Sequence, residues 1–143
     1  MNRVLFHLAF PVGNIATTKE FYVGGLGCTV GRESHRSVIL NLYDHQIVAH
    51  ISNESLEPQK GIYPRHFGLV FLSESDWEAL ADRAYKHNLT FYQEPKNRFR
   101  GLPIEHRTFF LQDPFYNLLE FKFYYDREAI FGDRQYAQVG DIG

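Results

Sequence analysis

Apolar and polar residues alternate along several short segments of the chain, and this two-residue period predicts β-strands. In residues 3–10, Phe6, Leu8 and Phe10 would share one face of a strand and His7 the other. A Pro-Val-Gly-Asn run from Pro11 is expected to break this strand. The other predicted strands occupy residues 29–33, 38–42, 46–51, 65–72, 90–93, 106–111 and 117–123.

Two segments instead show helical spacing behind a capping residue. Asn14 precedes a short helix over residues 17–22, and Ser73 precedes a longer one. The second helix is expected to bury one face, because its apolar residues recur every three or four positions. These residues are Trp77, Leu80, Ala81, Ala84 and Tyr85.

The order strand, helix and three strands therefore occurs twice, which indicates an internal repeat. We expect one domain over residues 1–143, with module one at about 1–55, module two at about 62–125, and a polar C-terminal tail at 126–143. Residues 53–63 are expected to form a linker. The predicted fold class is α+β, with tandem βαβββ modules whose mixed sheets form a cup around a metal site.

Composition excludes several classes of function. The net charge of −2 and pI of about 6.4 give no electrostatic footprint for nucleic acid. We see no signal peptide and no apolar run of roughly 18 residues, so a soluble cytoplasmic protein without membrane association is expected. Cys28 is the single cysteine, which rules out an intrachain disulfide. It is expected to be a small buried hydrophobic residue.

Polar residues inside apolar strands are the candidates for chemistry. His7 and His66 occupy the first strand of each repeat. His50 and Glu120 lie in the last strand of each repeat, so we interpret His50 as the counterpart of Glu120. A carboxylate in an apolar strand is costly unless it is paired or binds a metal. The ordinary alternatives are hydrogen-bonded core histidines and a glutamate paired with Lys or Arg.

Two imidazoles and one carboxylate that converge on one side of a site form a facial triad. Such nitrogen and oxygen ligands suit iron(II), and also manganese, nickel or zinc. His7, His66 and Glu120 are therefore the predicted metal ligands. Near the loop that begins at Gly101, His106 is a candidate acid or base and Arg98 a candidate partner for a substrate carboxylate. Solvation at the surface is the commoner fate for both of these residues.

The chain resembles the vicinal-oxygen-chelate superfamily, which includes glyoxalases, extradiol dioxygenases and antibiotic-resistance proteins. The resemblance covers roughly residues 3–124 and is most similar to a bacterial subgroup described as extradiol-dioxygenase-like. Its carriers are FHLAFPV at 6–12, FY at 21–22, LGC at 26–28, HQIVAH at 45–50, HFG at 66–68 and DPFYNLLEF at 113–121.

This resemblance implies a metal-dependent enzyme that acts on a small molecule with two adjacent oxygens. It implies His7, His66 and Glu120 as ligands, within one chain or across a homodimer. Glyoxalases place a fourth, glutamate ligand where His50 is expected, so His50 is either a ligand, a base or a packed strand residue. An iron(II) extradiol-type dioxygenase is the favoured reading. A glyoxalase-like lyase or isomerase and a metal-free drug-binding protein are the alternatives.

Overall fold

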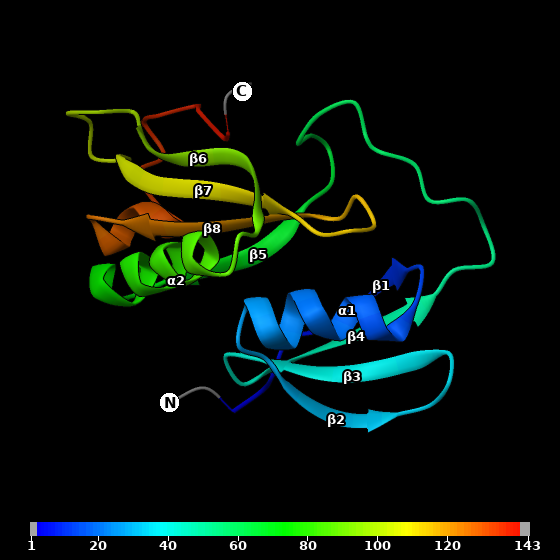
Figure 1. The fold of residues 1–143 in the computed structure, drawn as a ribbon. Coiled ribbons are helices and arrows are strands. Elements are labelled where there is room, and N and C mark those ends of the chain that lie inside the picture. The colour runs from blue at the N-terminus through cyan, green and yellow to red at the C-terminus, as the bar shows by residue number, and fades with distance from the viewer. Residues whose placement is uncertain (1–2, 141–143) are drawn as a thin grey trace.

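The computed structural model describes residues 3–140, which contain two four-stranded mixed sheets (Figure 1). The first sheet belongs to module one and has the strand order β1-β4-β3-β2. Strands β1 and β4 run parallel, and the remaining pairs are antiparallel. The strand bounds are β1 His7–Val12, β2 Thr29–Glu33, β3 Ser37–Leu42 and β4 His45–Ile51.

The second sheet belongs to module two and repeats this topology, with the order β5-β8-β7-β6 and a parallel β5–β8 pair. The strand bounds are β5 Phe67–Phe71, β6 Thr90–Arg98, β7 His106–Gln112 and β8 Leu118–Tyr124. Residues 52–66 connect the two sheets without a helix or strand. The predicted α+β class and tandem βαβββ order are thereby confirmed.

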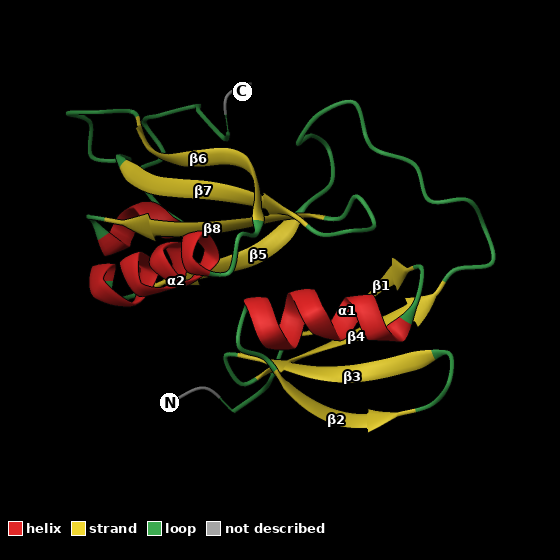
Figure 2. Cartoon of the chain, viewed as in Figure 1, coloured by secondary structure: helices red, strands yellow, loops and turns green. Residues whose placement is uncertain are grey.

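Helices lie on one side of each sheet (Figure 2). In module one, the Asn14 side chain accepts a hydrogen bond from the Thr17 amide, which caps α1 as predicted. In module two, Ser73 caps α2 by accepting from the Asp76 amide. The helix bounds are α1 Ile15–Lys19, η1 Glu20–Gly25, α2 Glu74–Lys86 and η2 Arg127–Ile130. No helix within residues 3–140 is long and apolar enough to cross a membrane.

The two modules share a hydrophobic core on their helical sides. Phe10 of β1 packs against Phe67 of β5, with 5.4 Å between ring centroids. Between modules, the Tyr22 hydroxyl donates to the Asp113 carboxylate at 2.7 Å, and Arg83 Nε donates to the Gly25 carbonyl at 2.7 Å. Because the core uses the helical side of each sheet, the opposite faces are left for chemistry.

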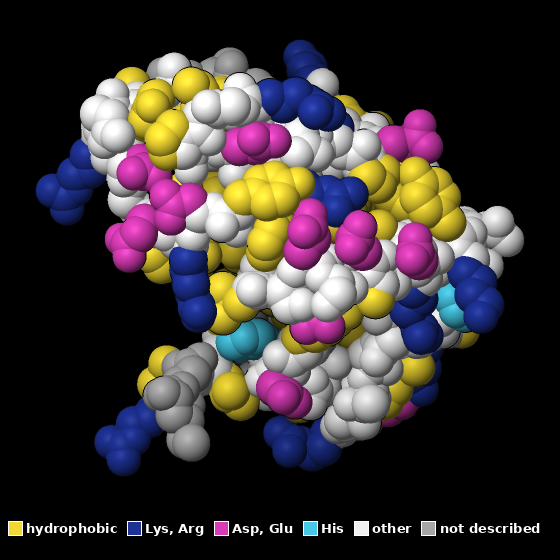
Figure 3. Space-filling view, turned by 90° about the vertical axis from the view of Figure 1, so that its left-hand side faces the viewer, with side chains coloured by type: hydrophobic (Ala, Val, Ile, Leu, Met, Phe, Trp, Pro, Cys, Tyr) yellow, Lys and Arg dark blue, Asp and Glu magenta, His cyan; other side chains and the backbone are white. Residues whose placement is uncertain are grey.

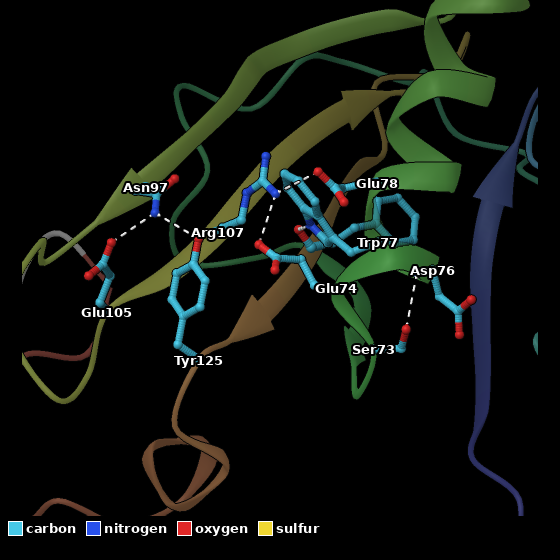
Figure 4. Close-up of polar contacts among 10 residues, drawn as sticks. Ser73, Glu74, Asp76, Trp77, Glu78, Asn97, Glu105, Arg107 and Tyr125 are labelled. Carbon is cyan, nitrogen blue, oxygen red and sulfur yellow. Dashed lines mark hydrogen bonds and ion pairs between the residues drawn. The ribbon is translucent and has the colours of Figure 1, made fainter.

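The predicted buried face of α2 anchors this helix to the second sheet, except that Tyr85, which was predicted to belong to it, is 48% exposed. Trp77 is 1% exposed, and its indole N–H donates to the Phe121 carbonyl at 2.8 Å. The Arg107 guanidinium lies 4.2 Å from a Trp77 ring centroid and also donates to Glu74 and Glu78 (Figure 4). On the face drawn in Figure 3, acidic and basic side chains are interspersed with hydrophobic ones.

Several predicted element bounds differ from the structure. The short helix predicted over residues 17–22 is instead α1 followed by η1, and other strand ends shift by one residue. Three further differences concern the surroundings of the candidate site. Strand β1 starts at His7 and continues through Pro11 to Val12, which is possible because proline is tolerated in an edge strand. Strand β5 starts one residue after His66, so this side chain belongs to the end of the linker. Strand β6 extends beyond the predicted residues 90–93 to Arg98, because it pairs with β7 as far as His106.

Candidate functional site

Glu120 is the centre of a polar cluster on the face of β8 that points away from the helices. Its side chain is 5% exposed. The Thr108 hydroxyl on β7 donates to Glu120 Oε2 at 2.5 Å, and His66 Nε2 lies 3.0 Å from Oε1. Burial raises the pKa of Glu120, but the hydrogen bonds from His66 and Thr108 and the charge of Lys122 outweigh it and hold the pKa below its usual value.

The protonation pattern of His66 makes this cluster a candidate metal site. Its Nδ1 lies 2.7 Å from the Ile62 carbonyl, which can only accept, so Nδ1 carries a proton. In the neutral ring, Nε2 then directs a lone pair at the Glu120 carboxylate. Two lone pairs at this distance of 3.0 Å repel each other unless a proton or a metal cation lies between them. In the absence of a metal the proton has this role, and the hydrogen bond to Glu120 therefore raises the pKa of His66.

This arrangement fits a bound divalent metal by the chemistry of its donors. Ligating histidines commonly donate their second ring N–H to a backbone carbonyl, and ligating carboxylates are commonly hydrogen-bonded themselves. His66 and Glu120 have these outer partners in Ile62 and Thr108. One imidazole nitrogen and one carboxylate oxygen are ligands that iron, manganese, nickel and zinc accept.

Gly68 brings the backbone of β5 close to that of β8 beside this cluster. It pairs with Glu120 in the parallel register. A Cβ atom placed on Gly68 would lie 1.6 Å from the Glu120 carbonyl oxygen, which is far inside van der Waals contact. The His-Phe-Gly sequence at 66–68 therefore links a ligand candidate to a position that excludes larger residues.

The two histidines of module one lie in a different environment. His7 is exposed, and its Nδ1 lies 2.6 Å from Gln46 Oε1 on the neighbouring strand. His50 is also exposed and pairs with Pro11. Gln46 and His50 point to the same face of β4 but are four residues apart, or about 13 Å along the strand. His7 and His50 are therefore too far apart to bind one metal ion together.

Strand register corrects the predicted equivalence of His50 and Glu120. Gly68, two residues after His66, pairs with Glu120. Ala9, two residues after His7, pairs with Val48. The counterpart of Glu120 in module one is thus Val48, and His50 lies two residues further along. The sequence could not reveal this, because the β1–β4 pairing is long-range and its offset is set by the fold.

The structure brings only two of the three predicted ligands together. Within residues 3–140, no group of three or more His, Cys, Asp or Glu side chains is placed to hold a metal ion. His66 and Glu120 are in contact, and His7 does not join them in the same chain. The other predicted arrangement, with His7 supplied across a two-fold interface, stays a prediction.

Arg98 and His106 are buried, in contrast to the surface positions that we considered most common for them. Arg98 is 6% exposed and lies 5.9 Å from the Phe110 ring centroid. His106 is 4% exposed, and its Nδ1 lies 3.0 Å from the Ile104 carbonyl. Burial lowers the pKa of His106, with Lys122 and Arg98 adding to the effect, so the ring is held neutral.

Comparison with known proteins assigns the chain to a family. Residues 4–121 match the model of the Glyoxalase/Bleomycin resistance protein/Dioxygenase superfamily. The chain belongs to this superfamily. A glyoxalase/bleomycin resistance protein/dioxygenase from Alicyclobacillus acidocaldarius is 37% identical with a TM-score of 0.86, and the match covers 90% of this chain and 97% of that chain. No curated protein sequence matches this chain.

More distant superfamily members share the fold alone. The fosfomycin resistance protein FosX from Listeria monocytogenes is 15% identical with a TM-score of 0.66, and the match covers 90% of this chain and 99% of that chain. A mutant of the Listeria protein, complexed with Mn(II) and 1S,2S-dihydroxypropylphosphonic acid, is 16% identical with a TM-score of 0.62 and coverage of 85% and 90%.

Sequence reasoning missed the residues that contact Glu120 besides His66. Thr108 and Lys122 face Glu120, with Lys122 Nζ at 4.0 Å from Glu120 Oε1. A signal for Thr108 was present, because it is a polar residue directly before Phe109 and Phe110 in a predicted strand. The contribution of the Ile62 carbonyl carries no side-chain signal, and only the path of the linker reveals it.

Proposed function

We propose that this chain is a divalent-metal-dependent enzyme that acts on a small molecule with two adjacent oxygen atoms. Its metal ligands are His66 and Glu120 of one chain together with His7. The observation that carries the proposal is the 3.0 Å approach of His66 Nε2 to Glu120 Oε1, with each side chain also held by a second hydrogen bond, to the Ile62 carbonyl and from the Thr108 hydroxyl. Polar residues held in this way are preorganised for a cation.

The metal would supply Lewis-acid chemistry by lowering the pKa of a bound hydroxyl or stabilising an enediolate. The chain's own residues do the positioning. Thr108 holds Glu120 Oε2, which leaves Oε1 directed at His66. The Ile62 carbonyl fixes the orientation and tautomer of the His66 ring. Lys122 brings a positive charge to the edge of the site, where it can attract an anionic substrate.

A second copy of the chain is the proposed source of His7. His7 is exposed at the start of β1, on the sheet face opposite the shared core. The residues immediately before it are apolar and mostly exposed: Val4 at 72%, Leu5 at 66% and Phe6 at 59%. A homodimer would cover these side chains and bring His7 to the His66–Glu120 pair of its partner.

The favoured reaction is an extradiol-type dioxygenation, in which a catechol ring is opened by molecular oxygen. Support comes from Val48, which occupies the module-one counterpart of Glu120 and provides no fourth ligand. The extradiol relatives that this chain resembles use three protein ligands, whereas glyoxalases use a further glutamate. Iron(II) is the favoured metal. Manganese, nickel and zinc are alternatives, and the Listeria FosX complex with Mn(II) supports the first of these.

His50, His106 and Arg98 keep their proposed roles around this centre. His106 is buried and neutral, so its free ring nitrogen can accept a proton but has none to give. His50 lies on the same sheet face as His7 and is the second candidate base. Arg98, next to His106 in the β6–β7 register, is the proposed partner of a substrate carboxylate. A base of this kind would also serve a glyoxalase-like isomerase, which is the second candidate function.

Metal content and oxygen uptake test the proposed function. Protein purified without added metal is analysed for iron, manganese, nickel and zinc, then loaded anaerobically with iron(II) and assayed with a panel of catechols beside Glu120→Ala. The proposal expects oxygen uptake by the wild type and none by the variant. Metal-dependent turnover of a hemithioacetal without oxygen uptake would assign the isomerase instead. Absence of both activities and of metal would leave a small-molecule binding protein.

Mixing two inactive variants tests the source of His7. His7→Ala and Glu120→Ala are each expected to lose metal binding. If the site spans two chains, equal amounts unfolded and refolded together give mixed dimers that contain one intact site each, and about a quarter of the wild-type metal content returns. If the site lies within one chain, every site keeps a lesion and no metal returns.

A further inference from the structure

A cavity of about 370 Å³ lies between the second sheet and the C-terminal residues 129–140. Ligand pockets start at roughly this size. Its floor includes Lys122 and Tyr124 of β8, which share a sheet face with Glu120 because alternate strand residues point the same way. Lys122 Nζ is 4.0 Å from Glu120 Oε1, so the cavity adjoins the proposed metal site.

The chain after β8 forms the roof of this cavity. Residues 129–134, with Tyr136 and residues 138–140, complete the lining, and this end of the chain lies near β6 and β7 (Figure 1). At its far end, Gly140 is so close to the Tyr63 hydroxyl that a side chain there would collide with it. The Tyr63 ring is 6.1 Å from the His66 ring. The roof thus extends from His106 towards the metal residues.

Two buried acceptor atoms belong to residues that line this cavity. Neither His106 Nε2 nor Asp133 Oδ2 has a hydrogen-bond partner among residues 3–140. Because the Ile104 carbonyl takes the Nδ1 proton, Nε2 of the neutral His106 ring carries a lone pair. A buried acceptor without a donor costs free energy, so such groups are normally satisfied by something in the adjacent space.

Aromatic rings frame the first of these acceptors. The Tyr124 ring is 4.5 Å from the His106 ring, and the Phe99 ring is 5.9 Å from it. Both rings also line the cavity. A ligand at this position therefore meets apolar ring surfaces and acceptor atoms, a combination that selects a mainly apolar group that ends in a hydrogen-bond donor.

We propose that this cavity binds the part of the substrate distant from its vicinal oxygens, and that His106 Nε2 accepts a hydrogen bond from a hydroxyl there. The inference rests on the proposed function and names its substrate class: a vicinal diol or catechol that carries a hydroxyl-bearing side chain. Phe110, the partner of Glu120, and His106 are four residues apart on β7, or about 13 Å, so that side chain is several bonds long.

Two catechols that differ by one hydroxyl test this assignment. 4-(3-Hydroxypropyl)catechol and 4-propylcatechol are titrated against the full chain by calorimetry, with and without Mn(II). In parallel, the ring nitrogens of His106 are followed by NMR in metal-free protein. The wild type is expected to prefer the hydroxylated compound about fivefold, as one neutral hydrogen bond gives. Only that compound is expected to shift the Nε2 resonance.

Variants separate recognition from folding. His106→Leu removes the acceptor and should bind both compounds equally, whereas His106→Gln retains an acceptor and should keep the preference. His35→Leu, an exposed histidine of module one, is the matched control and should behave as wild type. Equal wild-type affinities, an unmoved Nε2 resonance, or a preference that survives in His106→Leu would each overturn the assignment. If His106→Leu does not fold, the response of the wild-type His106 Nε2 resonance to the two catechols decides the assignment.

The outcomes also distinguish this inference from the proposed function. If metal-free protein prefers the hydroxylated compound but no metal binds in any titration, the cavity assignment stands and the enzyme proposal fails. If Mn(II) binds through His66 and Glu120 while the two catechols bind equally, the enzyme proposal stands and the role of His106 is overturned.

Discussion

The two modules share one topology and register but differ in what they place on the sheet face opposite the helices. Module two has the Glu120 carboxylate there, 5% exposed and in contact with His66. At the matching positions, module one has Val48 and an exposed His7 whose ring contacts the Gln46 side chain. Only one module carries the cost of a buried charge, and it also carries the hydrogen bonds that offset this cost.

This difference shows that the two modules of a duplicated fold contribute unequally to the candidate site. A buried carboxylate must be held by several donors or cations, and module two supplies them from β7, from β8 and from the end of the linker. An exposed histidine such as His7 needs little support from its own module, because water solvates its ring. We therefore expect substitutions at equivalent positions of the two modules to have unequal effects.

The largest difference is expected at the close contact of β5 and β8. Gly68→Ala places a Cβ atom 1.6 Å from the Glu120 carbonyl oxygen and must push the strands apart. We expect a loss of at least about 3 kcal/mol in the free energy of unfolding, measured by urea denaturation. The control Ala9→Gly, at the equivalent position of module one, should cost only about 1 kcal/mol. Equal losses would show that the modules are packed alike.

A smaller difference is expected when the donor to Glu120 is removed. Thr108→Val conserves shape but leaves Glu120 Oε2 without its 2.5 Å hydrogen bond. The expected results are a loss of about 1–3 kcal/mol in stability and a roughly tenfold or greater loss in metal affinity, as is usual for an outer partner of a ligand. Ser37 is the module-one counterpart, because it pairs with His50 as Thr108 pairs with Lys122.

The control Ser37→Ala removes a hydroxyl that contacts Ser34 and no carboxylate. Its stability is expected to change by less than about 0.5 kcal/mol, as for most surface substitutions. Calorimetric titration with Mn(II) measures the affinities. A Thr108→Val protein that binds metal as tightly as Ser37→Ala would remove Thr108 from the site.

The sequence was sufficient to predict the fold class and to single out two residues of the candidate site, because both depend on local pattern. Alternation identified the strands, capping residues identified α1 and α2, and His66 and Glu120 were conspicuous as polar residues in apolar segments. The offset between parallel strands is not local. The predicted equivalence of His50 and Glu120 was wrong for this reason, since only the β1–β4 register shows that Val48 matches Glu120.

The environment of His106 could not be predicted for a related reason. Its burial depends on a tail whose polar composition gives no indication that it covers a sheet. The buried position of Arg98 likewise requires β6 to continue five residues past its predicted end, and the pairing with β7 decides this. In both cases long-range contacts override what the nearby residues indicate.

Charged side chains on the helical sides of the sheets should also contribute more to stability in module two than in module one, but by a smaller margin. Arg107 in module two is 24% exposed, stacks on Trp77 and contacts two glutamates, whereas Lys19 in module one pairs with Glu33 at a more exposed position. Arg107→Met is expected to cost about 1–2 kcal/mol in unfolding free energy, and Lys19→Met less than about 1 kcal/mol. Added salt should reduce both effects, and similar losses would contradict the comparison.

The smallest expected effect concerns pH and the buried ring of His106. Burial holds the pKa of His106 below its usual value, and the charges of Lys122 and Arg98 lower it further, whereas the hydrogen bond to the Ile104 carbonyl and the charge of Glu120 oppose them. The folded protein therefore binds this proton more weakly than the unfolded chain, so the contribution of His106 to stability is present above pH 6.5 and is lost as the pH falls towards the folded pKa. His106→Gln has no such group. Its stability relative to wild type should thus improve as the pH is lowered through this range, in urea denaturation at a series of pH values. If the free energies of unfolding of the two proteins change in parallel with pH, the His106 ring is not excluded from water. The two sheet faces would then differ in the burial of Glu120 but not in that of His106.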